Sequence, residues 1–182
     1  MKQLVIDTLK NSHMQKIGFT YVGTTGFAFR IMPGDFTTVA LAVQYDNIHV
    51  QQGGAPAGMA RYSIRNDGAS QANTFYLGAN NTSQTVYESV LVHESVHAAF
   101  DLKGIWMPWL DNEVLAYIAQ GFYILSAGED AGLSKEALLG LEIARSFQTI
   151  KTDPFFLDEL KQSLLSNPYY KKYIRGTFQG DG

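Results

Sequence analysis

The sequence predicts an α+β fold, with mixed β-structure in the N-terminal part and helices through most of the C-terminal part. Short runs of alternating apolar and polar residues, separated by glycine-rich turns, occupy much of residues 19–78. From residue 85 onward, apolar residues recur at helical spacing. The chain has 182 residues and shows no linker or internal repeat, so we expect one domain over residues 1–182.

The N-terminal part predicts a helix, a hairpin and further strands. Residues 3–16 have the apolar spacing of a short amphipathic helix. The segment around Asp35 has two interpretations, because residues 39–45 alternate like a strand while Asp35 is suited to capping a helix over residues 36–46. The remaining predictions are a hairpin of residues 19–22 and 27–32, strands at 48–51, 59–64 and 73–78, and loops at 52–58 and 66–71.

The segment that begins near Thr85 predicts a buried helix. Thr85 and Glu88 have the spacing of an N-terminal capping box. The residues from Val86 to Phe100 are apolar on most sides of the helix, as expected inside a core. Gly104 is placed to end the helix.

This helix contains the sequence HESVH at residues 93–97. His93 and His97 are four residues apart and therefore lie on one helical face. Two imidazoles at this spacing can bind one Zn²⁺ ion, and Glu94 beside them can accept a proton from water. The alternative is a pair of core histidines, although a buried helix rarely keeps His, Glu and His together without polar partners.

A third ligand is expected from the next helix. Glu113 begins an apolar helical pattern, and Glu113, Tyr117 and Gln120 fall on the face opposite its apolar residues. The segment Leu102–Leu110 contains Gly104 and Pro108 and predicts a turn, so the two helices can bring Glu113 back over the histidines. Alternatively, Glu113 only complements the helix dipole in the first turn.

Two more helices are predicted towards the C-terminus. Ser134 begins the first, with an apolar face that includes Ile150, and Asp153-Pro154 begins the second, which runs to about Ser166. Pro168 follows its end. The tail from Tyr169 to Phe178 is apolar, and we expect it to lie in a groove beside the metal site, as a plug or lid.

The sequence HESVHAAFD followed by DNEVLAY resembles the gluzincin metallopeptidases, whose thermolysin-like members carry HExxH and then a glutamate in an NE-containing helix. The resemblance covers roughly residues 73–125. It implies that His93, His97 and Glu113 bind zinc and that Glu94 is the general base.

The resemblance extends to residues around the ligands. Asp101 matches an acidic position that often supports a ligand in this family. Tyr117 stands where many members have an aspartate that hydrogen-bonds the first histidine, so the chain departs from the family there. Tyr117 is also a candidate to stabilise the oxyanion. The other candidates for that role are Tyr123, Arg145 and the tyrosines near the C-terminus.

The strand at residues 73–78 resembles the family's edge strand, often written Asn-Ala-Phe, which pairs with the substrate backbone. A short connection to the HExxH helix keeps the strand near the zinc site. We therefore expect residues 73–77 to have an unpaired outer edge, open to a peptide. If both edges were paired instead, the peptidase interpretation would fall below its alternatives.

Composition limits the partners. The net charge of −3 argues against nucleic acid as the main partner, and the Lys171-Lys172 pair among tyrosines fits a solvated helix end better than a base-stacking surface. The chain has no cysteine, which excludes disulfides and thiolate chemistry.

No segment has transmembrane length or the form of a cleaved signal peptide, so a cytoplasmic protein and one exported without a visible signal both fit.

Three classes of function agree with these patterns. The first is a zinc peptidase acting on a peptide or protein substrate, in a housekeeping or a toxin or effector role. The second is a zinc hydrolase of a non-peptide amide. The third is a binding protein that keeps the metal site for structure, although such a site would not require Glu94.

Overall fold

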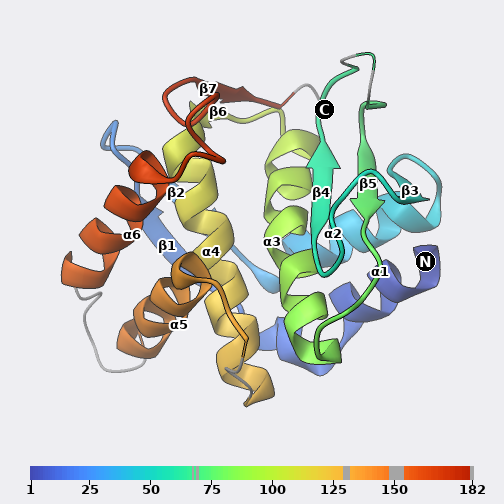
Figure 1. Ribbon diagram of the computed structural model, residues 1–182, viewed down its shortest axis with the longest axis horizontal. Coiled ribbons are helices and arrows are strands. Elements are labelled where there is room, and N and C mark those ends of the chain that lie inside the picture. Colours follow the sequence, from blue (N-terminus) through green and yellow to red (C-terminus); the bar gives the residue numbers. More distant parts are fainter. Residues whose placement is uncertain (67, 69, 129–131, 148–153, 181–182) are drawn as a thin grey trace.

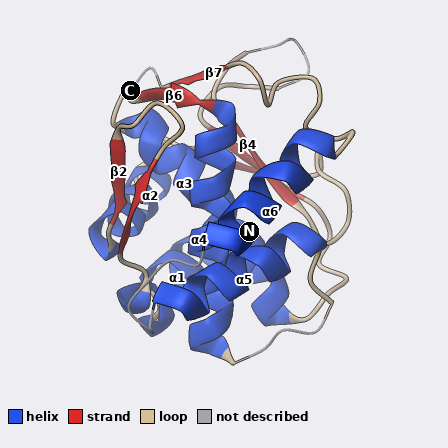
Figure 2. Cartoon of the chain, turned by 90° about the vertical axis from the view of Figure 1, so that its left-hand side faces the viewer, coloured by secondary structure: helices blue, strands red, loops and turns tan. Residues whose placement is uncertain are grey.

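Two long helices, α3 (Gln84–Leu102) and α4 (Trp109–Ala127), lie side by side at the centre of the computed structural model (Figure 1). The structure describes residues 1–66, 68, 70–128, 132–147 and 154–180. Helices form the body of the molecule and short strands lie at its periphery, which confirms the predicted α+β class (Figure 2). One hydrophobic core joins side chains from the N-terminal helices, α3, α4 and the C-terminal segment.

The N-terminal segment contains more helix than strand. Helix α1 (Lys2–Lys10) and a 3₁₀ turn (Ser12–Lys16) share the region predicted as one helix. The predicted hairpin is confirmed as β1 (Phe19–Val22) and β2 (Ala28–Ile31). Residues 33–44 form helix α2 (Pro33–Gln44), so the helical interpretation of this segment is correct and the strand interpretation is wrong. Asp35 accepts a hydrogen bond from the Met32 amide at the start of α2, which stabilises the helical alternative.

A three-stranded sheet packs against α3, and its strand order corrects one prediction. The sheet contains β3 (His49–Gln52), β4 (Ala60–Ser63) and β5 (Thr74–Leu77) in the order β3-β5-β4. Strand β5 pairs with β3 in parallel and with β4 antiparallel, so both of its edges are taken. The expected unpaired edge at residues 73–77 is therefore wrong. The edge strand next to α3 is β4.

The starts of α3 and α4 also differ from the prediction. The side chain of Ser83, not Thr85, caps α3 by accepting a hydrogen bond from the Val86 amide. Helix α4 begins at Trp109, four residues before Glu113, so Glu113 lies in the second turn. The predicted turn contains strand β6 (Trp106–Pro108), which pairs with the C-terminal strand β7 (Thr177–Gln179).

Helices α5 (Lys135–Phe147) and α6 (Pro154–Ser166) cover the side of α4 that faces away from α3 (Figure 1). Ser134 caps α5 as predicted, whereas Asp153 and Ile150 lie outside the described residues. Helices α4 and α5 touch at Gly121 and Gly140, where an added Cβ would lie 2.2 Å from a backbone oxygen of the opposite helix. Among the described residues, no helix is long and apolar enough to cross a membrane.

Candidate metal centre

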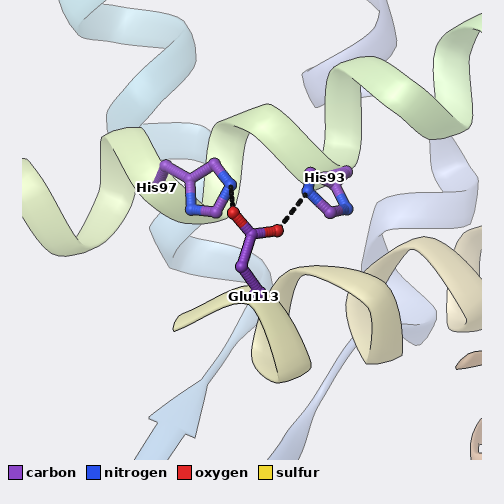
Figure 3. A group of neighbouring side chains, drawn as sticks. All are labelled: His93, His97 and Glu113. Atoms are coloured by element: carbon purple, nitrogen blue, oxygen red, sulfur yellow. Dashed lines mark ion pairs between the residues drawn. The ribbon is translucent and has the colours of Figure 1, made fainter. Parts of the chain in front are cut away.

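Three side chains from the two central helices converge on one point. His93 and His97 project from α3, and Glu113 projects towards them from α4 (Figure 3). His93 Nε2 lies 3.3 Å from Glu113 Oε2, and His97 Nε2 lies 3.8 Å from Glu113 Oε1. All three side chains are buried, and their ligand atoms lie within 4.8 Å of one another. The predicted ligand set is therefore brought together. Glu113 lies in the second turn of α4 and not at its start, as the sequence had predicted.

The geometry of this group fits a zinc ion. Two ligand atoms that sit about 2.1 Å from zinc at a tetrahedral angle are about 3.4 Å apart. The two imidazole–carboxylate distances, 3.3 Å and 3.8 Å, bracket this value. Glu113 Oε2 is buried and has no hydrogen-bond partner within the described residues, which a metal ion would supply. The donor set of two imidazoles and one carboxylate is also one that zinc prefers.

The position of Glu113 excludes the helix-dipole alternative. Its carboxylate lies against two imidazoles of α3 and not among the free amides of the first turn of α4. The charges of His97 and His93 hold the pKa of Glu113 below its ordinary value, although burial alone would raise it. An ionised carboxylate is the form that binds a cation.

The orientation of His97 is set by Asn112, the residue before Glu113. The amide oxygen of Asn112 contacts His97 Nδ1 and can accept a hydrogen bond from its N–H group, which leaves Nε2 directed at Glu113. Both side chains are buried. Because Asn112 and Glu113 are neighbours on α4, one turn of helix supplies a ligand and the residue that orients another ligand.

His93 has a less polar environment. Its Nδ1 has no hydrogen-bond partner among the described residues, and the ring of Tyr117 packs against it edge-on, with centroids 4.4 Å apart. Burial alone would lower the pKa of His93, but the nearby charge of the Glu113 carboxylate raises it, and Glu94 and Gln120 add to the increase. Tyr117 therefore contacts His93 through its ring.

Glu94 faces the same space as the ligands. Its Oε2 accepts a hydrogen bond of 2.7 Å from the backbone amide of Tyr62 on β4. Burial raises the pKa of Glu94, against the lowering effects of His97 and His93. No protein donor among the described residues contacts the second oxygen, Oε1. That oxygen is available to take a proton.

Tyr62 joins the edge strand to the HExxH helix twice. In addition to its amide, its hydroxyl donates a hydrogen bond of 2.7 Å to Asp101, which is buried one turn after His97. This bond anchors β4, and the ligand-supporting role that the resemblance implies for Asp101 stays a prediction. The Tyr62 amide points away from β5, and the amide and carbonyl of one residue in an antiparallel strand point to the same side. The outer edge of β4 therefore faces the metal centre at Tyr62.

Two cavities adjoin the centre, with volumes of about 330 Å³ and 300 Å³. His93, Glu94, Tyr169 and Tyr170 line both of them. Tyr169, Tyr170 and Tyr173 of the C-terminal tail lie beside the site, whereas Phe178 is fully buried on β7. The role of the tail as a plug or lid stays a prediction.

The C-terminal tyrosines also contact the centre directly. The hydroxyl of Tyr170 is hydrogen-bonded to that of Tyr117, and Tyr173 donates a hydrogen bond of 3.1 Å to Glu113 Oε1. Burial is the main cause that raises the pKa of Tyr117 and Tyr170 far above the ordinary value, and the charge of Glu113 adds to it. Both phenols therefore stay protonated at neutral pH and can act as hydrogen-bond donors.

Other sequence candidates lie away from the centre. Tyr123 bonds to Glu88 and Asn11, and Arg145 pairs with Glu142 on the surface of α5. Neither residue lines the two cavities, so neither can act as an oxyanion donor there. His13 contacts Ser126, and the exposed His49 lies on β3, so the described metal-ligand group has no further histidine.

The comparisons with known proteins give no family for this chain. No family model, no curated protein and no solved structure matches it. The case for a function therefore depends on the geometry of the centre and on the residues around it.

Proposed function

We propose that this protein is a zinc-dependent hydrolase of amide bonds, in a peptide or in a small acyl amide, with Glu94 as its general base. The observation that carries the proposal is the convergence of His93, His97 and Glu113 at zinc-binding distances, with Glu94 lining the same cavities. Three protein ligands leave a fourth position of zinc for water or substrate. A site that served only for structure would be closed by a fourth protein ligand and would not need Glu94.

The residues of the chain have distinct parts in the reaction. Zinc, when bound, would polarise a carbonyl and lower the pKa of a water. Glu94 takes the proton of the attacking water on Oε1 and passes it to the leaving amine. The amide of Tyr62 fixes Oε2, so the carboxylate keeps one orientation during both transfers. Tyr170 donates a hydrogen bond to the developing oxyanion, and Tyr117 positions the Tyr170 hydroxyl.

The peptidase interpretation has lost its first structural support and gained another. Strand β5 is internal, so it cannot accept a substrate backbone, and by that criterion alone a non-peptide amide ranks higher. Strand β4, however, is an edge strand whose outer side faces the centre at Tyr62, and it offers the same mode of pairing. Against this, the Tyr62 amide is already bonded to Glu94, which favours a small amide substrate that needs no strand pairing.

The decisive experiment combines metal content with cleavage of a mixed peptide library. The wild type should bind one equivalent of zinc and cleave peptides, and His97→Ala should lose the zinc. Glu94→Gln should keep zinc and fold but lose about 10²–10⁴-fold in turnover, because the proton transfers depend on the carboxylate. Tyr170→Phe should lower kcat and leave the zinc content unchanged.

The surface variant Glu142→Gln is the matched control, since Glu142 is exposed and far from the cavities. A Glu94→Gln protein with wild-type turnover would exclude the mechanism. Zinc binding without cleavage of any library peptide, combined with cleavage of small acyl amides, would establish the non-peptide alternative. Zinc binding without either activity would leave the structural role.

A further inference from the structure

The two cavities beside the metal centre differ in chemical character. They meet at His93, Glu94 and the tyrosines, and they extend in opposite directions along β4. The cavity at the C-terminal end of β4 is lined by Arg61 and Arg65. The cavity at the N-terminal end is lined instead by apolar side chains that include Met59, Val86, Val90 and Leu133. A chain lying across the centre would meet cations on one side and hydrocarbon on the other.

The two arginines are held in place without a carboxylate. The guanidinium of Arg61 lies over the ring of Tyr76, 4.8 Å from its centroid, and donates a hydrogen bond to Ser70. Arg65 donates to the side-chain oxygen of Gln179 on β7. Neither arginine forms an ion pair with an acidic residue in the described parts of the chain. Each guanidinium has five N–H donors, so most of this capacity remains for a ligand.

The surroundings increase the positive potential at this end. Arg61 and Tyr169 line the same cavity, which places the cation beside the metal centre. Lys171 and Lys172 are exposed on the segment whose tyrosines face the cavities. Glu94 and Glu113 also line this cavity, so Arg61 and Arg65 make only the end away from the metal ligands positive. This end would attract anionic ligands to the cavity from solution.

We propose that the arginine-lined cavity binds the carboxylate of an aspartate or glutamate side chain in the substrate, next to the bond that is cleaved. This inference rests on the proposed function, because it names the substrate class of the same centre. Arg61 and Arg65 provide charge-assisted hydrogen bonds to the carboxylate. The apolar cavity takes the uncharged side chains on the other side of the scissile bond.

A binding experiment tests this inference without catalysis. Metal-free protein is titrated into fluorescein-labelled short peptides that carry either glutamate or glutamine at the same positions, and anisotropy is measured. The glutamate peptides should bind about tenfold more tightly. The double variant Arg61→Gln/Arg65→Gln should lose this preference. The single variant Arg65→Gln, at an exposed residue, should lose part of it. The control Arg30→Gln, which changes an exposed arginine outside both cavities, should keep it.

The outcomes separate this inference from the proposed function. Equal binding of both peptides, or a preference that survives loss of both arginines, would overturn it. So would equally tight binding of an oligothymidylate of the same charge, because the cavity would then recognise charge alone. Preference for glutamate without any cleavage by the zinc-loaded protein would contradict the peptidase proposal only. Cleavage of the library at sites with no acidic residue nearby would contradict this inference only.

Discussion

The metal centre and its rim are built in different ways. The ligands come from two neighbouring helices, α3 and α4, and their positions follow from helical spacing and a short connection. The rim comes from strand β4 and from the segment Tyr169–Gln179, which lie far apart in the sequence and meet only in the fold (Figure 1). The bond from Arg65 to Gln179 spans 114 positions of the chain.

This difference separates chemistry from specificity. Under the proposed function, the reaction would depend on groups that two adjacent helices supply, whereas the substrate would be selected by groups that depend on long-range packing. The helix pair should therefore respond to substitution mainly through stability and metal affinity. The rim should respond mainly through substrate binding.

The largest expected effect concerns the packing that holds α4. An added side chain at Gly140 would meet the backbone oxygen of Tyr117 at 2.2 Å, so Gly140→Val must push α5 away from α4. We expect the free energy of unfolding of the metal-free protein to fall by about 3 kcal/mol, measured by urea denaturation. Gly34→Ala is the control, because nothing lies within 4 Å of the added Cβ. Equal urea midpoints for the two variants would show that the close helix contact is not required.

The next effect concerns the orientation of a ligand. Asn112→Ala removes the oxygen that contacts His97 Nδ1, and we expect zinc affinity to fall about 10–100-fold, as is typical for residues that orient ligands. Competition with a chromogenic zinc chelator measures the affinity. Asn112→Asp keeps an acceptor at this position and should retain most of the affinity. If Asn112→Ala bound zinc like the wild type, the histidine would be positioned by packing alone.

A smaller effect is expected where the rim joins the helix pair. Tyr62→Phe removes the hydrogen bond to the buried Asp101 but keeps the backbone bond to Glu94. We expect a loss of about 1.5 kcal/mol in unfolding free energy, because the acceptor is a carboxylate, together with a raised KM and a nearly unchanged kcat. Tyr45→Phe, at an exposed tyrosine, should change neither quantity. A fall in kcat alone would contradict the role of Tyr62 in placing β4.

The sequence predicted the centre better than the rim, for a physical reason. The i, i+4 histidines and the carboxylate on the following helix are local patterns, and the structure brings these three side chains together. The sequence analysis did not predict that Asn112 orients His97, although Asn112 adjoins Glu113. Its position on the same helical turn as Glu113 was the signal that could have indicated this role. The predicted start of α4 at Glu113 was wrong, because the sequence analysis included Trp109 and Leu110 in a turn around Pro108.

The strand order had no local signal. Residues 73–78 and 59–64 were both predicted as strands, but alternation does not say which one occupies the edge of a sheet. Strand β3 pairs with β5 in parallel, and such a pairing needs a long connection that the sequence pattern does not specify. Tyr62 bonds to Glu94 and to Asp101, which are 32 and 39 positions away in the sequence. Local patterns therefore could not predict this role of Tyr62.

The smallest expected effect concerns the residue that supports the C-terminal segment, and it is measured as a change of stability with pH. Glu136 on α5 accepts hydrogen bonds from Ser163 on α6 and from Asn167, which precedes the tyrosines of the rim. Burial alone would raise the pKa of Glu136, but the hydrogen bonds that its carboxylate accepts lower it below the ordinary value of 4.5. The stabilisation is therefore complete above pH 4.5 and is lost as the pH falls through the lower pKa of the folded state.

Glu136→Gln tests this dependence, because the amide oxygen still accepts a hydrogen bond but carries no charge. At pH 7 the variant should be less stable than the wild type by about 1 kcal/mol. The difference should stay unchanged from pH 7 to about pH 4.5 and should then shrink over the range below pH 4.5, since the wild-type carboxyl becomes protonated there. Urea denaturation of metal-free protein measures it without interference from zinc release. A difference that stayed constant over this range would mean that Glu136 supports the segment by shape and not by charge, and the rim would then keep its placement in acid.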